Sequence, residues 1–317
     1  MFVLQIIVGL VLLTLGANLL TEGAAAVAKR LRLSEFMIGA TIVAVGTSTP
    51  ELVVSVQSAI QGQADVSIGN VVGSNIFNIY AILGLTSLVI PIAFTRRNVR
   101  RDLPICLGVS LLLCLLALDG TLWGGGYNIL SRVDGVVLLL LYVLFLWYMI
   151  RSGRGDSESE PEGCKAPKQL WVALLFIVLG VCGLVVGSDM FLDGSIELAR
   201  RAGISEAVIG IVFVAAGTSL PELFASLVPA LKGKNDIALG NILGSNVANI
   251  LLILGLSSTI TPLRLDGISA TDMAVMVSAV VALILSARFV GRNRITRIEG
   301  VFLFAVYVAY TLWLLGA

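Results

Sequence analysis

The sequence predicts an all-α polytopic membrane protein, with ten transmembrane helices in two inverted five-helix repeats. The 317 residues are 57% hydrophobic and only 13% charged, whereas a soluble protein carries about 25% charged residues. Apolar runs of about 20 residues, the length that crosses a bilayer, recur along the chain. The two halves of the chain also share a long block of sequence. A β-barrel would need about 10-residue segments of alternating hydrophobicity, and the sequence has none.

Ten apolar segments predict the ten spans. They lie at 2–22, 36–61, 67–90, 103–119 and 133–150, and at 169–191, 205–231, 237–260, 269–287 and 298–316. The first lacks a preceding basic region and a clear cleavage site, so we interpret it as a retained helix and not a signal peptide. The polar stretch after the fifth span is rich in Gly, Ser, Pro and Glu and is expected to be a linker. The expected domains are residues 1–150, the linker 151–168, and residues 169–317.

The two halves are related by an internal duplication. VAVGTSTPELVVS at 43–55 aligns with VAAGTSLPELFAS at 214–226, and ADVSIGNVVGSNIFNI at 64–79 aligns with NDIALGNILGSNVANI at 235–250. Both alignments have an offset of 171 residues (214 − 43 and 235 − 64) and no gap. Chance similarity between apolar helices would not match Gly, Pro, Glu and Asn. Because five spans is an odd number, the two repeats are expected to cross the membrane in opposite senses.

The basic residues predict the orientation. If the N-terminus is outside, 17 of the 21 Lys and Arg residues lie in cytoplasmic loops, and four lie outside: Arg132, Arg200, Arg201 and Arg264. This is the distribution that the positive-inside rule demands. We therefore expect a protein of the plasma or inner membrane, with both termini outside and the linker in the cytoplasm. The run TRRNVRRD at 95–102 is interpreted as part of this topology signal, with a lipid-headgroup or nucleotide patch as the alternative.

Composition argues against several other functions. A net charge of +1 gives no reason to expect a nucleic-acid partner. The sequence has no histidine, which removes the commonest proton carrier. The four cysteines have no CxxC spacing and are expected to be small buried hydrophobic residues, not disulfides: Cys106, Cys114, Cys164 and Cys182.

Two carboxylates lie near the centres of the second and seventh spans, Glu51 and Glu222, at matched positions of the repeat. An ionised side chain at this depth costs several kcal/mol unless it faces protein or water. No Lys or Arg lies within an expected span, so no basic side chain is expected to neutralise them. Two carboxylates balance one divalent cation, and oxygen ligands suit Ca²⁺. The neighbouring hydroxyls add oxygen, with no thiol or imidazole nearby: Thr47, Ser48, Thr218 and Ser219.

A proline directly precedes each glutamate, Pro50 and Pro221. Proline removes a helical N–H group and clashes with the carbonyl four residues earlier. Both prolines are therefore expected to break their helices and to free the backbone oxygens of Gly46 and Gly217. A freed carbonyl within a membrane needs a partner, and a bound cation is one.

The stretch GNxxGSNxxN, present in both repeats, is expected to form the other wall of the site. Ser74 and Asn78 lie four residues apart and share one helix face, as do Ser245 and Asn249. The glycines of the stretch allow helix backbones to approach closely. The intervening asparagines, Asn75 and Asn246, are expected to make structural hydrogen bonds.

These motifs resemble the two α-repeats of the cation/calcium exchanger superfamily, of the prokaryotic sodium/calcium exchanger type. The resemblance covers the whole chain in architecture and about 40 residues per half in motif. It implies a secondary antiporter, not an enzyme, that exchanges Na⁺ for Ca²⁺ by alternating access and needs no cofactor. A Ca²⁺ (or other cation)/H⁺ exchanger with the same core is the alternative. The expected spans contain no His or Lys that could act as the base of an intramembrane hydrolase. A channel is disfavoured because a site with two glutamates would bind a divalent ion too tightly for fast passage.

The resemblance also implies the ligands. Ca²⁺ would bind the carboxylates of Glu51 and Glu222 and the backbone oxygens of Thr47 and Thr218. Na⁺ would bind oxygens of Ala44, Thr47, Ser48, Ser74, Ala215, Thr218, Ser219 and Ser245. A middle position would combine both glutamates with Asn78 and Asn249. Some members have an acidic residue at one of these two asparagine positions, so the present chain has less negative charge there, and potassium dependence is not expected.

The resemblance implies partners and motion as well. The partners are Na⁺, Ca²⁺ and the lipid bilayer, and we expect a monomer. Exchange of three Na⁺ for one Ca²⁺ would move one net charge. In the family the first and sixth helices slide across the core, and Gly16, Gly23, Gly187 and Gly194 are expected to ease this sliding.

Overall fold

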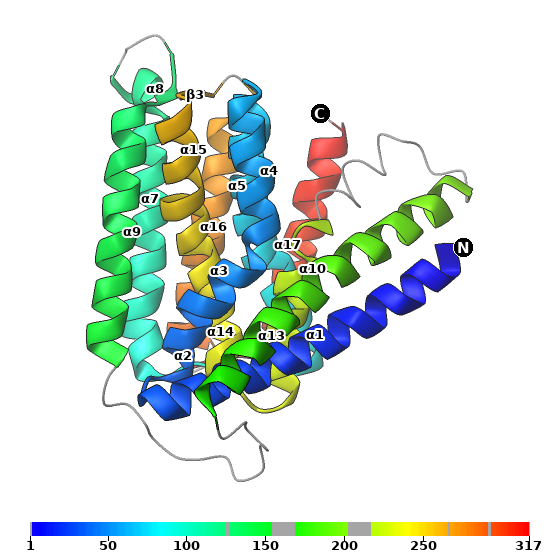
Figure 1. The fold of residues 1–317 in the computed structure, drawn as a ribbon. Helices are drawn as coiled ribbons and strands as arrows, with labels where there is room; N and C mark the ends of the chain where they lie inside the picture. The colour runs from blue at the N-terminus through cyan, green and yellow to red at the C-terminus, as the bar shows by residue number, and fades with distance from the viewer. Residues whose placement is uncertain are drawn as a thin grey trace. The chain divides into compact units, whose positions relative to one another are not determined.

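The structure is a computed structural model that describes residues 2–123, 127–153, 169–201, 217–265, 267–290 and 293–316. These residues are almost entirely helical (Figure 1). They form two compact units, and each unit combines segments from both sequence repeats. Unit 1 contains Met1–Ser48, Met149–Gly244 and Ala305–Ala317, and unit 2 contains Thr49–Tyr148 and Ser245–Phe304. Compact packing and sequence duplication therefore divide the chain differently.

Unit 1 is built on two long helices that lie side by side, α1 (Phe2–Leu31) and α10 (Leu170–Arg201) (Figure 1). Glycines allow their backbones to touch: a Cβ atom at Gly16 would lie 2.8 Å from Gly180 O, and one at Gly9 would lie 2.8 Å from Gly187 O. The contacts run in opposite chain directions, so the two helices are antiparallel. The remaining elements of the unit are α2 (Glu35–Ile38), η1 (Gly39–Val43), α3 (Ala44–Thr47), α13 (Leu220–Leu231), α14 (Asn235–Ala248) as far as Gly244, and the end of α17 (Arg297–Gly316).

The glycines of the second GNxxG stretch are used for close packing in unit 1. A Cβ atom at Gly240 would lie 2.9 Å from Ala40 N, and at Gly244 it would meet the backbone of Ala40. A larger side chain at either position would push α14 away from η1. The expectation that these glycines allow backbones to approach is confirmed for this pair.

Unit 2 consists of α-helices interrupted by π-helical segments. Its elements are α4 (Thr49–Ile60), α5 (Ala64–Ile76), η2 (Phe77–Leu83), α6 (Gly84–Val89), η3 (Asn98–Asp102), α7 (Leu103–Ala117), α8 (Asp119–Trp123), α9 (Arg132–Gly153) to Tyr148, η5 (Asn249–Leu254), α15 (Gly255–Ile260), α16 (Ala270–Leu285), η6 (Ser286–Val290) and α17 to Phe304.

Two short strand pairs join segments of unit 2, and the sequence did not predict them. Strand β1 (Ile92–Ala93) pairs antiparallel with β4 (Arg294–Ile295), and β2 (Ile129–Leu130) pairs antiparallel with β3 (Leu263–Arg264). Each strand has two residues, too few for a period-two pattern to be visible in the sequence.

The repeat extends to the last helix of each half. At the start of α9, Asp134 Oδ2 accepts a hydrogen bond from Ser131 N at 2.8 Å, and at the start of α17, Glu299 Oε2 accepts one from Thr296 N at 2.8 Å. The offset between these pairs is 165 residues (299 − 134), six fewer than in the motif blocks. The changed offset explains why a gap-free comparison ends before these helices.

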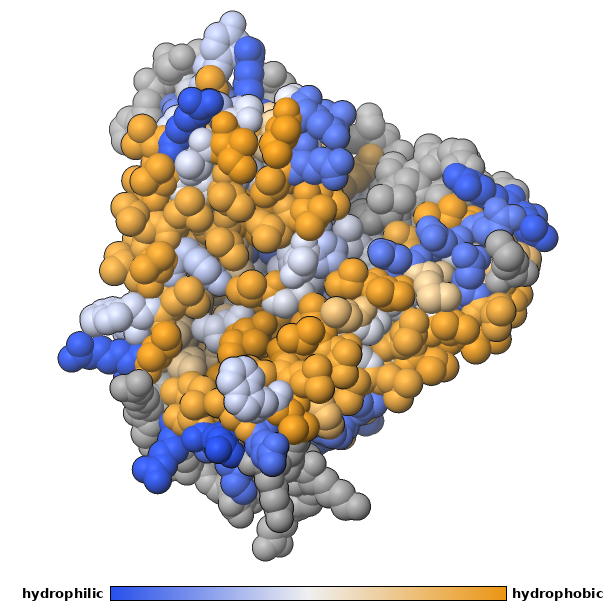
Figure 2. Space-filling view, viewed as in Figure 1, coloured by the Kyte–Doolittle hydropathy of each residue, from blue (hydrophilic) through white to orange (hydrophobic). Residues whose placement is uncertain are grey.

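The helices have the apolar surfaces that a lipid environment requires. Seven helices of the described residues are long and apolar enough to cross a membrane, or eight if the bent pair Glu35–Thr47 and Thr49–Ile60 counts as one span. Val133, Trp171 and Ile298 are 72%, 80% and 81% exposed. Figure 2 shows hydrophobic side chains along the visible faces of the helices in each unit, with hydrophilic ones near the helix ends. The expected count of ten spans is not confirmed by these helices, and residues 205–216 of the expected seventh span lie outside the described residues.

The cysteines follow the expectation only in part. Cys106 is buried, Cys114 is half-buried, and Cys182 is exposed on the apolar helix α10. The expectation of burial was therefore wrong for Cys182, because a small apolar residue is as well accommodated by lipid as by a protein core. Cys164 lies outside the described residues.

Candidate cation-binding site

The chain breaks its helix at the same place in both repeats. Helix α3 ends at Thr47 and α4 begins at Thr49, with a bend of 50° between them. The intervening Ser48 has φ −79° and ψ 12°, and the matched Ser219 has φ −96° and ψ 8°. Pro50 and Pro221 are the second residues of the helices that follow. At that position the missing N–H group leaves no carbonyl unsatisfied, so the prolines suit a helix start after a break.

One of the two carbonyls that proline was expected to free has a protein partner. Ser188 Oγ, on α10, donates a hydrogen bond to Gly217 O at 2.7 Å. The freed carbonyl was expected to need a partner, and Ser188 supplies one for one of its two lone pairs. The residue matched to Ser188 at the 171-residue offset is Ala17, which has no hydroxyl group. The first repeat therefore has no matched serine hydroxyl to donate to the carbonyl of Gly46.

In unit 1, Glu222 has a buried carboxylate with polar neighbours and no basic partner. Its side chain is 1% exposed. Ser48 Oγ donates a hydrogen bond to Oε1 at 2.9 Å. Oε2 is buried and has no hydrogen-bond partner among the described residues. No Lys or Arg of the described segments forms an ion pair with this carboxylate. The arrangement leaves one carboxylate oxygen available to a ligand that is not part of the chain.

An asparagine clamp holds the backbone at Glu222. Asn241 Nδ2 donates to Glu222 O at 3.3 Å and to Ser226 Oγ at 3.0 Å. Thr47 Oγ1 in turn donates to Asn241 Oδ1 at 3.1 Å. Asn241 is fully buried. The clamp therefore fixes α14, α13 and the end of α3 to one another within unit 1.

The same clamp exists at Glu51 in unit 2. Asn70 Nδ2 donates to Glu51 O at 3.2 Å and to Ser55 Oγ at 2.9 Å. All three residues match those of the first clamp at the 171-residue offset. Neither clamp is predicted by the residues nearest the glutamates, because each asparagine lies 19 residues from its glutamate in the sequence. The available signal was a polar residue repeated within an otherwise apolar helix.

Four asparagines form a reciprocal amide cluster in unit 2. Asn75 Nδ2 donates to Asn246 O at 3.2 Å, and Asn246 Nδ2 donates to Asn75 O at 3.3 Å. Asn78 Nδ2 donates to Asn246 Oδ1 at 2.9 Å, and Asn249 Nδ2 donates to Asn75 Oδ1 at 3.0 Å. The structural role expected of Asn75 and Asn246 is confirmed.

Two side-chain oxygens of the amide cluster accept no hydrogen bond from the described residues. The amide nitrogens of Asn78 and Asn249 are both engaged, and Oδ1 of each is buried with no hydrogen-bond partner among the described residues. Ser245 Oγ is also buried without a partner in this part of the chain. Buried polar atoms without partners are rare and costly. Each of these oxygens is a potential ligand of a hard cation.

The expected ligands fall into both units. Unit 1 holds Ala44, Thr47, Ser48, Ser219 and Glu222, all buried, together with the half-buried Thr218. Unit 2 holds Glu51, Ser74, Asn78, Ser245 and Asn249, all buried. Ala215 lies outside the described residues. The functional groups of these side chains are all oxygens or amides, which suits hard cations such as Na⁺ and Ca²⁺.

Comparison with known proteins places the chain in a family. The family model described as sodium/calcium exchanger protein matches residues 1–151 and 172–316. The chain is 39% identical over 313 residues to the putative antiporter CaxA of Alkalimonas amylolytica, covering 96% of each chain. It is 32% identical over 341 residues to the sodium/calcium exchanger MaX1 of Methanosarcina acetivorans, covering 97% of this chain and 96% of MaX1.

The fold agrees with this placement. A structure of the sodium-calcium exchanger NCX_Mj, soaked with 10 mM Na⁺ and no Ca²⁺, matches with a TM-score of 0.82 and 32% identity over 97% of both chains. The chain thus has the helical, multi-pass membrane fold of a cation-exchange antiporter, and its family is one of transporters, not of enzymes. The protein belongs to the sodium/calcium exchanger family, as a prokaryotic-type member of the cation/calcium exchanger superfamily.

Proposed function

We propose that this protein is a secondary antiporter that exchanges Na⁺ for Ca²⁺ across the plasma (inner) membrane by alternating access. The observation that supports it best is the buried Glu222 carboxylate, which has an unpartnered oxygen and no basic neighbour in the described segments. A permanent ion pair would make such a carboxylate structural. A carboxylate with only hydroxyl donors is instead suited to a cation that comes and goes.

In this proposal Ca²⁺ is bound by the carboxylates of Glu51 and Glu222 and by the backbone oxygens of Thr47 and Thr218. Two carboxylates neutralise one divalent ion. Carbonyl and hydroxyl oxygens complete the 6–8 ligands that Ca²⁺ typically takes. The joint action of the two glutamates is inferred from the internal repeat, in which they occupy matched positions.

Sodium competes for the same region. The proposed Na⁺ ligands are oxygens of Ala44, Thr47, Ser48, Ser74, Ala215, Thr218, Ser219 and Ser245, and the middle position combines Asn78 and Asn249 with the two glutamates. Two Na⁺ balance the carboxylates, and neutral oxygens hold a third. Exchange is then electrogenic, because three monovalent charges replace two. Since both amide positions are Asn, we expect no potassium requirement.

The proposed membrane topology is ten helices in two inverted repeats, residues 1–150 and 169–317, joined by the linker 151–168. Both termini lie outside and the linker lies in the cytoplasm, in agreement with the excess of basic residues in the cytoplasmic loops. A monomer suffices for transport, because one chain supplies both glutamates.

The carboxylate assignment is tested with Glu51→Gln and Glu222→Gln in proteoliposomes. Each substitution keeps the side-chain shape and removes one charge, so Na⁺-driven uptake of radioactive Ca²⁺ should fall to background. Glu197→Gln is the matched control, because Glu197 is exposed and pairs with Arg201 on the helix surface. Ca²⁺ uptake at the wild-type rate in either site variant would refute the assignment.

The counter-ion is tested by imposing one gradient at a time. We expect Ca²⁺ efflux from loaded vesicles to require external Na⁺ and to be unaffected by a pH gradient in its absence. Efflux driven by the pH gradient alone would instead identify a Ca²⁺/H⁺ exchanger.

A further inference from the structure

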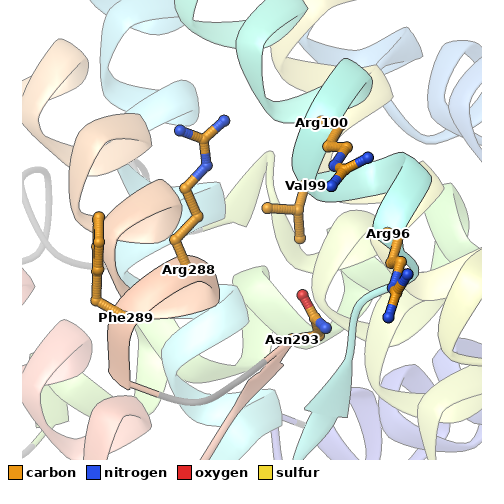
Figure 3. A pocket seen from close by; sticks show the side chains of 6 residues that line it. All are labelled: Arg96, Val99, Arg100, Arg288, Phe289 and Asn293. Atoms are coloured by element: carbon orange, nitrogen blue, oxygen red, sulfur yellow. The ribbon is translucent and has the colours of Figure 1, made fainter.

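Unit 2 has a cavity of about 580 Å³ at one end, lined by Arg96, Val99, Arg100, Arg288, Phe289 and Asn293. Figure 3 shows Arg288 on one side of this cavity and Arg96 and Arg100 on the other, with Val99 and Asn293 between them. The volume lies in the range of about 300–1,000 Å³ that ligand pockets occupy. We refer to it as the arginine pocket. None of its residues belongs to the proposed cation site.

The arginines of the run TRRNVRRD do not all line the pocket. Arg101 Nε donates to Asp102 Oδ1 at 2.7 Å, and its guanidinium lies 5.4 Å from the centre of the Tyr148 ring. Arg96 and Arg100 are one helical turn apart, so they share a face and line the pocket. Arg101 therefore contributes to packing, whereas Arg96 and Arg100 line the pocket.

The pocket arginines have no carboxylate partner in the part of the chain that the structure describes. Asp102 is engaged by Arg101 and by Asn98 Nδ2, which donates at 3.2 Å. Glu299 accepts hydrogen bonds from Ser286 and Thr296. The pocket lining contains Arg96, Arg100 and Arg288 and no acidic residue, so it is a site of positive charge that favours an anion.

The floor of the pocket is held in place by backbone hydrogen bonds. Asn293 has φ +68°, the left-handed region that Asn tolerates better than most residues. Its N–H group donates to Ala287 O at 3.0 Å, and its carbonyl accepts from Phe94 N at 2.7 Å. These bonds fix the backbone beside the β1–β4 pair and leave the side-chain amide at the pocket, as an additional hydrogen-bond donor.

The surface beside the pocket is apolar. Phe289 and Val290, next to Arg288 in η6, are 74% and 69% exposed. Aromatic and basic side chains occur together where a membrane protein meets lipid headgroups. The matched end of the other repeat is different: at the 171-residue offset, Arg96 and Arg100 correspond to Gly267 and Thr271. These arginines are therefore not duplicated at the offset of the motif blocks.

From these observations we infer that the arginine pocket binds the phosphate group of an anionic phospholipid. Guanidinium groups donate two parallel hydrogen bonds to phosphate oxygens, and basic pockets between membrane helices bind anionic headgroups. Phe289 and Val290 would contact the acyl region of the same lipid. Free inorganic phosphate has the same recognition chemistry, so the experiment must separate the two sources.

The test measures lipid binding to the full-length protein in detergent by native mass spectrometry. Phosphatidylglycerol is compared with phosphatidylcholine of the same acyl chains. We expect phosphatidylglycerol to bind preferentially, and Arg100→Gln/Arg288→Gln to weaken its binding by roughly tenfold or more, since each charge-assisted hydrogen bond contributes about that factor. Arg132→Gln/Arg264→Gln is the control, because it removes the same charge from unit 2 outside the pocket.

A second measurement separates the sources and checks folding. Phosphatidylglycerol should raise the apparent melting temperature of the wild type and of the control, but not of the pocket variant, whose melting temperature without lipid should be unchanged. Inorganic phosphate at millimolar concentration should not reproduce the rise; if it does, free phosphate is the ligand and the lipid assignment is overturned. Equal binding of phosphatidylglycerol by the pocket variant and the control would show that the arginine pocket is not the lipid-binding site.

Discussion

At the scale of single residues, the two asparagine clamps are the feature that most constrains the glutamates. Asn241 bonds the backbone oxygen of Glu222 and the hydroxyl of Ser226, and Asn70 does the same at Glu51 and Ser55. Neither clamp touches a carboxylate group. Each fixes the peptide from which the carboxylate projects, so each acts on cation binding through the position of the glutamate.

We expect Asn241→Ala to lower both stability and Ca²⁺ affinity. The substitution leaves the oxygen of Glu222 and the hydroxyl of Ser226 without their donor, and a buried polar group without a partner costs about 1–3 kcal/mol. The free energy of unfolding in denaturant and the half-saturating Ca²⁺ concentration should both change.

Two further variants identify the clamp as the cause. Ser226→Ala removes only one acceptor of Asn241 and should have the smaller effect on Ca²⁺ affinity. Asn70→Ala, the matched change in unit 2, should resemble Asn241→Ala. Unchanged Ca²⁺ affinity in both asparagine variants would show that the clamps serve stability alone.

At the scale of elements, the glycines of α1 and α10 face each other. Gly16 meets Gly180 and Leu184, and Gly23 meets Ala173 and Ile177. The glycines were expected to ease sliding of each helix across the core. In the structure these glycines bring the two helices into close contact, so we expect α1 and α10 to slide together as one body.

We expect Gly16→Ala to destabilise the protein by about 1–3 kcal/mol, the usual cost of overpacking. The added Cβ atom would lie 2.8 Å from both Gly180 O and Leu184 N, which are backbone atoms that cannot rotate away. The apparent melting temperature in detergent measures the effect. Gly108→Ala on α7 is the control, because its Cβ atom meets no atom of the described chain within 4 Å; a similar loss there would contradict the packing explanation.

Two ion pairs connect the loop before α14 with α1 and α2. Lys234 Nζ lies 2.8 Å from Glu35 Oε1, with side-chain exposures of 5% and 29%, and Lys232 Nζ lies 3.3 Å from Glu22 Oε1, with exposures of 30% and 37%. The residues matched to the two lysines in the first repeat are Gln63 and Gln61. These charges therefore belong to one repeat only.

The two pairs should differ in strength. Glu35→Gln leaves the buried ammonium of Lys234 without a counter-charge and should cost about 1–3 kcal/mol. Glu22→Gln removes a more exposed and salt-screened pair and should cost about 0–1 kcal/mol. Denaturant unfolding of the two variants at low and high salt provides the comparison, and equal losses would indicate that burial does not determine their contribution.

At the scale of the whole molecule, the proposed exchange of three Na⁺ for one Ca²⁺ makes transport sensitive to voltage. One net charge moved across the membrane is worth about 2.3 kcal/mol per 100 mV, or roughly a fiftyfold change in the Ca²⁺ gradient at equilibrium.

We therefore expect a potential set by valinomycin and a K⁺ gradient to accelerate Na⁺-driven Ca²⁺ uptake when the inside is positive, the direction that favours net export of positive charge. The same vesicles without valinomycin are the control. Uptake that is independent of potential would indicate electroneutral exchange of two Na⁺ for one Ca²⁺.

The sequence by itself determined the membrane class and the internal repeat, and it singled out the two glutamates as matched residues. These features depend on local composition and on residues that recur at a fixed offset, so they need no knowledge of contacts. The offset of 171 residues also made Asn75 and Asn246 identifiable as structural, because polar residues repeated in an apolar helix need partners.

Only the tertiary structure decided which residues meet. Thr47 and Asn241 are 194 residues apart in the chain yet share a hydrogen bond, and Ser48 reaches Glu222 across 174 residues. Arg288 joins Arg96 and Arg100 at one pocket, although the run at 95–102 does not indicate that Arg288 lies beside it. Helix packing brings such residues together, and packing depends on the shapes of all helix faces at once. That is why each compact unit combines segments of both repeats, which a linear comparison of the two halves does not reveal.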